Sequence, residues 1–200
     1  MPERTRRAHM ASIRGTQLKE DMTALAWLGP AARAEVLKRL SPETVRQIEE
    51  ASRVDWLPHA LVVEICRCIR EVSGEEAVRG WSRAAVNGAL QGTLFRPFLE
   101  GVIAVFGLSP AAGLKILPKA YLAALKDCGE LQVVDMGPGW ARMVLAGLPP
   151  EARVREWLVS VAGGFEVIFD ACRVQGRVEL EFDGPHADPR FRATWDGSPL

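Results

Sequence analysis

The sequence predicts an α+β fold, in which an N-terminal helical bundle is followed by a four-stranded antiparallel sheet with a long helix packed on it. Three observations lead to this fold class. Apolar residues recur at helical spacing through the first 129 residues. After Gly129 the period shortens to the two residues of a strand. The two final strand-like segments, residues 177–182 and 190–195, alternate in a way that suits an antiparallel hairpin.

Capping signals divide the helical part. Residues 31–40 form an amphipathic pattern, and Ser41-Pro42-Glu43 then supplies an N-cap, a first helical residue and a first-turn acid. A further helix is expected to start at Asp55-Trp56-Leu57-Pro58 and to end at Gly74. Pro97 opens another predicted helix, and Ser109-Pro110 repeats the capping pattern. Pro118 is expected to end or kink the helix that follows.

The sheet part has the order strand, strand, helix, strand, strand. Residues 131–136 and 140–146 are the first two predicted strands, joined by a glycine-rich turn. Residues 151–172 form the predicted long helix, in which Gly163-Gly164 indicates close packing or a kink. In the closing hairpin we expect Phe182 opposite Phe191, Leu180 opposite Ala193 and Val178 opposite Trp195.

Length and composition favour one domain. The chain has 200 residues, of which 48% are hydrophobic, enough for one core. We expect a flexible basic tail over residues 1–15 and a single α+β domain over residues 16–200, with a helical part at 16–129 and a sheet part at 130–196. Lys plus Arg equals Asp plus Glu, at 25 each, which argues against nucleic acid as a partner. No apolar run suits a signal peptide or a membrane span, so a cytoplasmic location is expected.

No set of residues predicts catalysis. The three histidines are far apart in the sequence, and no motif of a hydrolase, a metalloprotease or a nucleotide-binding loop occurs. The pair Cys66 and Cys68 has the wrong spacing for a metal clamp on a helix. We therefore expect no enzyme activity, no metal site, and four reduced cysteines.

Two groups of residues are candidates for binding. Tyr121, Trp140, Trp157 and Phe165 could line an apolar ligand pocket between the helices and the sheet, although the same residues could form ordinary core. A stripe of small residues on one helix could serve a protein partner or a homodimer, although internal packing is a commoner reason for such a stripe. The stripe consists of Gly80, Ala84 and Gly88.

The C-terminal part resembles a known superfamily. The residues that carry the resemblance are Gly129-Glu130-Leu131, the strand at 140–146, Leu148-Pro149-Pro150, the helix at 157–172 and the closing hairpin. This arrangement is similar to the end of the superfamily of haem nitric-oxide-binding domains, vinyl-4-reductase-type ligand-sensing domains and TRAPP-type vesicle-tethering subunits. The front half resembles an uncharacterised family expanded in myxobacteria, through Leu40-Ser41-Pro42-Glu43, Asp55-Trp56-Leu57-Pro58 and the helix around Gly80.

The resemblance implies a function class and sharpens the expectation on cofactors. Haem-binding members of the superfamily use a helix histidine and a Tyr-x-Ser-x-Arg motif, whereas this chain has neither that motif nor a histidine between Leu94 and Cys128. Zinc-bearing members use a cysteine cluster near the last hairpin, where only Cys172 lies. We therefore expect neither haem nor zinc. The resemblance implies a non-catalytic module of a bacterial signalling system that binds a small apolar molecule, or alternatively a dimeric protein-interaction adapter with no ligand.

Overall fold

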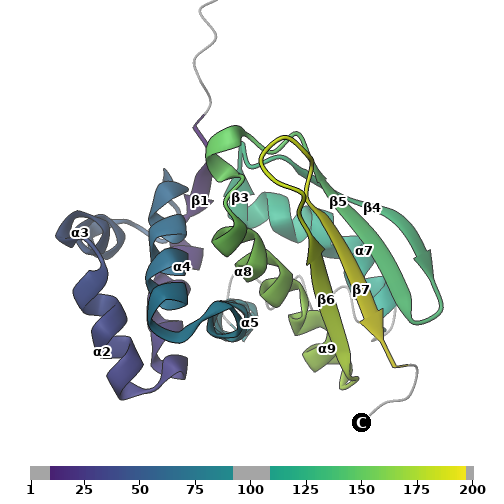
Figure 1. Cartoon of the computed structure of the whole chain (residues 1–200), viewed down its shortest axis with the longest axis horizontal. Helices are drawn as coiled ribbons and strands as arrows, with labels where there is room; N and C mark the ends of the chain where they lie inside the picture. The colour runs from purple at the N-terminus through teal and green to yellow at the C-terminus, as the bar shows by residue number, and fades with distance from the viewer. Residues whose placement is uncertain (1–9, 92–108, 197–200) are drawn as a thin grey trace, which may run out of the picture.

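The computed structural model describes residues 10–91 and 109–196 and confirms the α+β class. Figure 1 shows the N-terminal helices on one side of the molecule and the C-terminal strands on the other, with the helix α8 between them. The N-terminal elements are β1 (Ser12–Arg14), α1 (Gly15–Ala24), η1 (Leu25–Leu28), α2 (Pro30–Arg39), α3 (Pro42–Glu50), β2 (Trp56–Pro58), α4 (Ala60–Ser73) and α5 (Glu75–Gln91). The C-terminal elements are α7 (Pro110–Ala124), β3 (Leu125–Lys126), β4 (Glu130–Gly137), β5 (Trp140–Ala146), η2 (Pro150–Ala152), α8 (Arg155–Phe165), α9 (Val167–Cys172), β6 (Gly176–Glu181) and β7 (Arg190–Trp195).

Both predicted caps begin helices. The Ser41 hydroxyl accepts a hydrogen bond from the Thr44 amide at the start of α3, and the Ser109 hydroxyl accepts one from the Ala112 amide at the start of α7. α7 does not end at Pro118 but continues to Ala124. The helix expected from Pro97 lies outside the described residues.

The expected helix start at residue 55 is wrong, because residues 56–58 form the strand β2. This strand pairs with β1, which also pairs with β3, so a small sheet of order β2-β1-β3 links the two parts of the chain. Its central residue, Ile13, is 3% exposed and faces Leu57 on one side and Leu125 on the other. The Arg14 guanidinium lies 3.9 Å from the centroid of the Trp56 ring, a favourable cation–π contact.

The flexible tail expected over residues 1–15 is too long. Ser12–Arg14 form the central strand of the small sheet and Gly15 begins α1. The alternation of side chains over three residues is too short to be recognised as a strand from the sequence. Residues 1–9 lie outside the described residues.

The C-terminal sheet has the expected four antiparallel strands, in the order β4-β5-β7-β6. The final hairpin is present, but its expected register is wrong by two residues: Leu180 faces Phe191, Val178 faces Ala193 and Gly176 faces Trp195. A shift of two residues keeps every side chain on its own face of the sheet, and oppositely charged pairs still meet, as in Glu179 opposite Arg192. Two registers therefore satisfied the sequence pattern equally well.

Packing behind the hairpin selects the observed register. A Cβ atom at Gly176 would lie 2.5 Å from the Phe169 ring, so only glycine fits there. This contact fixes the start of β6 against α9 and places Gly176 opposite Trp195. The ring centroids of Phe169 and Trp195 are 6.1 Å apart.

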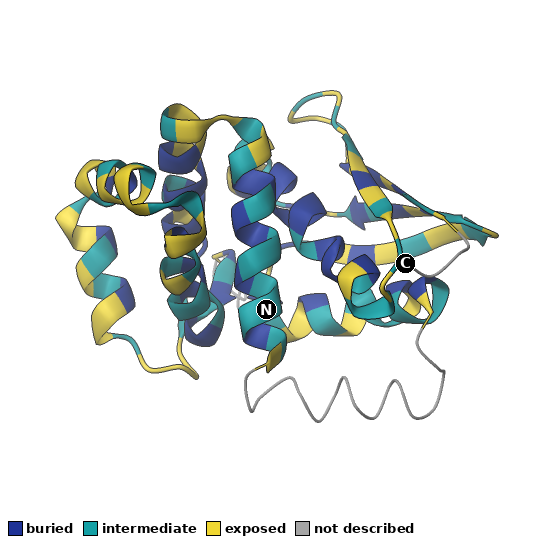
Figure 2. Ribbon diagram, turned by 90° about the horizontal axis from the view of Figure 1, so that it is seen from below, coloured by how far each residue is buried: buried dark blue, intermediate teal, exposed yellow. Residues whose placement is uncertain are grey.

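The expected long helix is broken at Glu166 into α8 and α9. A Cβ atom at Gly163 would lie 2.3 Å from the Arg79 carbonyl oxygen, which confirms the predicted close packing at the glycine pair. α8 thus approaches the backbone of α5 closely on one side and packs against β6 on the other. Figure 2 shows the buried residues gathered between the helices and on the face of the sheet that turns toward them. None of the described helices is both long and apolar enough to cross a membrane.

Candidate functional site

An apolar cavity of about 140 Å³ lies where α1, α5, α7 and α8 meet. Its wall is almost wholly hydrocarbon, contributed by residues such as Val62, Val86, Leu117 and Val161. Gly164 also lines it, since α8 carries no side chain at that point. The space lies beside the α5–α8 contact, and Ala124 and Leu125 line it where α7 meets β3.

The structure brings three of the four predicted pocket residues together. Tyr121 from α7 and Trp157 and Phe165 from α8 line the cavity. Trp140 does not, because the buried residues of β5 are Ala141, Met143 and Leu145, and alternation therefore places Trp140 on the other face of the sheet.

Tyr121 turns its polar end away from the cavity. Its hydroxyl donates a hydrogen bond of 2.6 Å to the Cys128 carbonyl oxygen, and the residue is 5% exposed. Burial raises the pKa of this hydroxyl well above its usual range. Tyr121 therefore contributes its ring to the wall and remains uncharged.

Asp21 on α1 is the residue that sequence reasoning missed. It lines the cavity and is 4% exposed, and Oδ1 accepts a hydrogen bond of 2.9 Å from the Gln17 side chain. Its Oδ2 is buried and has no hydrogen-bond partner among the described residues. The Trp81 indole donates to the backbone carbonyl of Asp21, not to the carboxyl group. A buried carboxyl oxygen without a partner is costly and suggests a missing ligand.

Burial raises the pKa of Asp21 from 3.8 to about 7, opposed by the Gln17 hydrogen bond and assisted by the neighbouring charge of Glu20. The thiol of Cys66 on α4 also lies near Asp21, and burial raises the pKa of this thiol above its usual range. A sequence signal for Asp21 existed: it lies between Leu18 and Leu25, at spacings of three and four, on the buried stripe of α1 and η1.

The small-residue stripe of α5 is covered within the chain at its first position. A Cβ atom at Gly80 would lie 2.1 Å from the Trp27 ring of η1, and one at Gly88 would lie 3.2 Å from the Glu20 carboxylate. Ala84 is partly exposed. Internal packing thus accounts for Gly80, and the use of Gly80, Ala84 and Gly88 as an interface stays a prediction.

A second hollow, of about 420 Å³, lies at the surface beside His59. Exposed residues such as Arg67 and Glu151 form much of its wall. His59 is 3% exposed, and its Nε2 has no hydrogen-bond partner among the described residues. Its ring lies edge-on to the Trp157 ring, with the two ring centroids 4.3 Å apart. Burial lowers the pKa of His59 from 6.5 to about 4, so the ring is neutral at neutral pH.

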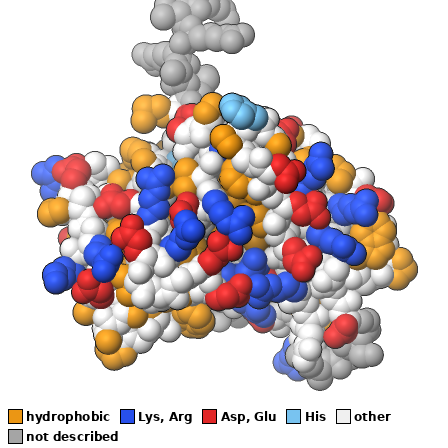
Figure 3. Space-filling view, viewed as in Figure 1, with side chains coloured by type: hydrophobic (Ala, Val, Ile, Leu, Met, Phe, Trp, Pro, Cys, Tyr) orange, Lys and Arg blue, Asp and Glu red, His pale blue; other side chains and the backbone are white. Residues whose placement is uncertain are grey.

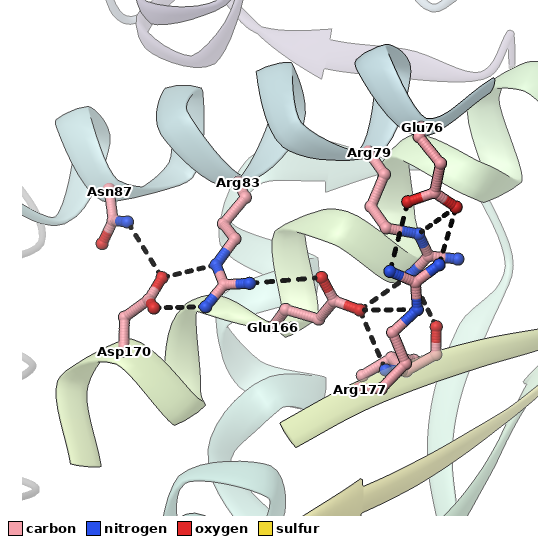
Figure 4. Close-up of polar contacts among 8 residues, drawn as sticks. Glu76, Arg79, Arg83, Asn87, Glu166, Asp170 and Arg177 are labelled. Carbon is pink, nitrogen blue, oxygen red and sulfur yellow. Dashed lines mark hydrogen bonds and ion pairs between the residues drawn. The ribbon is translucent and has the colours of Figure 1, made fainter. Parts of the chain in front are cut away.

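A cluster of charged side chains ties α5 to α9 and β6 (Figure 4). The buried Glu166 accepts hydrogen bonds from the Arg79 guanidinium at 2.8 Å and from the Val178 amide at 3.0 Å. Arg83 Nη1 lies 3.6 Å from the other Glu166 oxygen, and Arg177 Nε lies 3.8 Å from the first. Both oxygens of the Glu166 carboxylate therefore face cations. The buried Arg79 Nε has no hydrogen-bond partner among the described residues and lies 3.9 Å from the Glu76 carboxylate.

The surface over these helices carries intermixed positive and negative side chains (Figure 3). Several form ion pairs between elements, among them Arg155 with Glu75, Arg177 with Glu76 and Arg153 with Asp188. No three His, Cys, Asp or Glu side chains form a possible metal site within residues 10–91 and 109–196. Cys66, Cys68, Cys128 and Cys172 are all free thiols.

Comparison with known proteins identifies the fold through structure alone. No family model matches the sequence, and no curated protein matches it. The chain is similar to the solved structure of the unliganded Fe(II) H-NOX protein from K. algicida, with a TM-score of 0.64 and 9% identity, covering 94% of this chain and 99% of that one. It is also similar to a mutant of Cs H-NOX, with a TM-score of 0.63 and 14% identity, covering 94% and 98%. The fold is therefore H-NOX-like, which confirms the fold that the resemblance implied.

The expectation that the chain has no cofactor is contradicted by these comparisons. A third similar structure, with a TM-score of 0.60, 12% identity and 94% and 97% coverage, belongs to work on haem distortion in the H-NOX family. A fourth, with a TM-score of 0.62, 12% identity and the same coverage, concerns haem redox potential. The expectation relied on the missing histidine and Tyr-x-Ser-x-Arg motif, whereas these similar structures belong to H-NOX proteins studied for their haem.

The cavity as described does not fit a haem group. Its volume of about 140 Å³ is below the roughly 300–1,000 Å³ of pockets for drug-sized ligands. Among residue types that bind haem iron, the described lining offers only Tyr121, whose hydroxyl already donates to Cys128. Neither His59 nor His186 lines it. Binding of haem here would require the helices around the cavity to separate.

Proposed function

We propose that this protein is a ligand-binding sensory domain that holds a small, mostly apolar molecule in the cavity between α1, α5, α7 and α8. The single observation that carries the proposal is this cavity, lined by Tyr121, Trp157 and Phe165, within an H-NOX-like fold. One similar structure addresses the mechanism of H-NOX activation, which supports a sensory role. The proposal includes a non-catalytic role in a bacterial signalling system in the cytoplasm.

Ligand binding is tested by thermal unfolding with toluene, a probe of suitable size. A ligand that binds only the folded protein stabilises it by about 2.7 kcal/mol at a hundred times its Kd, so saturating toluene is expected to raise the Tm. Ala124→Leu fills part of the cavity wall and is expected to reduce this rise. Ala123→Leu, on the exposed side of the same helix, is the matched control and is expected to preserve it.

Haem is tested in the same series because the structural neighbours point to it. Purified protein is mixed with hemin, and the Soret absorption and the Tm are recorded for the unaltered chain, Ala124→Leu and Tyr121→Phe. A Soret shift that both substitutions remove would identify haem as the cavity's ligand. If neither toluene nor hemin changes the Tm, or if Ala124→Leu responds as Ala123→Leu does, the cavity is not a ligand site and the proposal fails.

A further inference from the structure

One residue of the cavity wall carries a buried carboxyl oxygen without a hydrogen-bond partner among the described residues. Asp21 Oδ2 is buried and lacks a hydrogen-bond partner among the described residues, whereas Oδ1 is satisfied by Gln17. The residue is 4% exposed and lines an otherwise apolar space. Burying a carboxyl group in such surroundings costs free energy unless something pairs with it. A ligand in the cavity would supply such a partner.

The other residues that line the cavity indicate which charge a ligand group beside Asp21 would carry. No Lys, Arg or His is among the described residues that line the cavity. Four aromatic rings, those of Trp81, Tyr121, Trp157 and Phe165, do line it, and the faces of aromatic rings attract cations. A cavity lined by a carboxylate and by aromatic rings suits an ammonium group better than it suits an anion or a neutral hydroxyl.

The volume limits the size of the ligand. A dry, apolar cavity of about 150 Å³ is known to hold benzene, and this cavity has about 140 Å³. A single ring, or a short alkyl chain with one polar group, therefore fills it. Larger amines would need the helices to separate.

We propose, on the basis of the proposed ligand-binding function, that the cavity takes a small apolar amine whose ammonium group pairs with Asp21. Its hydrocarbon body lies among Trp81, Trp157 and Phe165. The carboxyl of Asp21 ionises near neutral pH, since its pKa is about 7. Glu20 on α1 adds negative charge beside it, and Cys66 on α4 contributes a neutral thiol. On the other walls, Trp81 and Ser82 of α5, Ser160 of α8 and Tyr121 of α7 are uncharged.

The experiment compares three probes of one shape by isothermal titration calorimetry at pH 7.5: benzylamine, benzyl alcohol and toluene. A charge-assisted hydrogen bond contributes about 1.5–3 kcal/mol, so benzylamine is expected to bind about tenfold or more tightly than either neutral probe. Asp21→Asn keeps the size of the side chain and the acceptor for Gln17. It is expected to lose that preference and to retain toluene binding, which also shows that the variant is folded.

The outcomes separate this inference from the proposed function. Equal binding of all three probes, or benzylamine binding that Asp21→Asn leaves unchanged, overturns the amine proposal while leaving a ligand cavity in place. Absence of binding by all three probes overturns both. Should Asp21→Asn fail to fold, the unaltered protein provides the test: benzylamine affinity is expected to fall several-fold from pH 8 to pH 5.5, while benzyl alcohol affinity stays constant. A flat benzylamine profile would also overturn the proposal.

Discussion

Two buried carboxyl groups, Glu166 and Asp21, differ in their contacts. Glu166 is 2% exposed, accepts hydrogen bonds from Arg79 and Val178, and has two further arginines within 4 Å. Asp21 is 4% exposed, accepts one hydrogen bond from Gln17 and leaves Oδ2 unpaired. Both are almost fully buried, so burial alone does not distinguish them.

The difference separates a structural role from a binding role. The arginines around Glu166 compensate for its desolvation and join α5 to α9 and β6. Among the described residues, the Asp21 carboxyl accepts a hydrogen bond only from Gln17 on its own helix, which compensates its desolvation in part. Removing one partner of a buried ion pair destabilises a protein strongly. A buried carboxyl oxygen without a partner lowers stability, and a ligand that pairs with it only in the folded state raises stability.

The largest expected effect comes from removing the satisfied carboxylate. Glu166→Ala leaves the Arg79 guanidinium buried without its counter-ion and the Val178 amide without its acceptor, so we expect a loss of about 5 kcal/mol in the free energy of unfolding. Glu75→Ala is the matched control, because Glu75 forms an exposed ion pair with Arg155, and such pairs contribute about 0–1 kcal/mol. Urea unfolding measures the loss in the free energy of unfolding for both variants. Equal losses would show that the buried Glu166 contributes no more to stability than the exposed Glu75.

The second effect is a pH dependence from Asp21. Its pKa is about 7 in the folded chain and 3.8 in the reference state, so the folded state binds the proton more tightly. Its contribution to stability is complete below about pH 4 and is lost as the pH rises to about 7. Relative to the unaltered chain, Asp21→Asn is therefore expected to gain on the order of 3 kcal/mol between pH 4 and pH 8.

Urea unfolding at several pH values from 4 to 8 tests this expectation. A stability difference between the two proteins that does not vary with pH would show that Asp21 is not buried as an ionisable group. Asp21 and Glu166 could then no longer be compared as two buried carboxyl groups.

The smallest of the three effects has the opposite sign. His59 is buried with Nε2 unpaired, and its pKa is lowered from 6.5 to about 4. The unfolded chain therefore binds more protons between these values, and stability is lost as the pH falls from about 6.5 to 4. His59→Phe keeps a ring against Trp157 and removes the titration. We expect it to gain on the order of 2 kcal/mol relative to the unaltered chain over that acidic range.

Thermal unfolding between pH 4 and pH 7 measures the effect of His59→Phe. In the unaltered protein the titrations of His59 and Asp21 oppose each other over this range, so only the single variants reveal them. A His59→Phe protein with an unchanged pH profile would show that water reaches the ring.

The fold was predictable where local chemistry determined it. Ser41-Pro42 and Ser109-Pro110 begin helices wherever they occur, and the alternation in the last twenty residues suits no other structure than a strand pair. Three-residue strands carry too little pattern, so β1 and β2 were missed. The hairpin register depended on the contact between Gly176 and Phe169, which no local pattern contains.

The candidate site was predictable only in its apolar part. Sequence reasoning found Tyr121, Trp157 and Phe165 because large aromatic residues on inward helix faces tend to meet. It misplaced Trp140 because side chains alternate along β5, and Trp140 lies on the face of the sheet opposite to the buried residues. Asp21 was missed because it belongs to the charged run Lys19-Glu20-Asp21, and charged residues are mostly exposed to solvent. Only the packing of the neighbouring helices shows that this one is buried. The expectation on haem failed because it relied on motifs, whereas the fold is conserved in shape at 9–14% identity.

The small sheet β2-β1-β3 also affects how the chain is made. β1 can pair with β2 once residue 58 has emerged from the ribosome, but its other edge pairs with β3 at Leu125, about 110 residues after Ile13. At a synthesis rate of about 5–20 residues per second, that edge stays open for roughly 5 to 20 s. During translation the nascent chain therefore exposes an unpaired strand edge, at which another chain could pair.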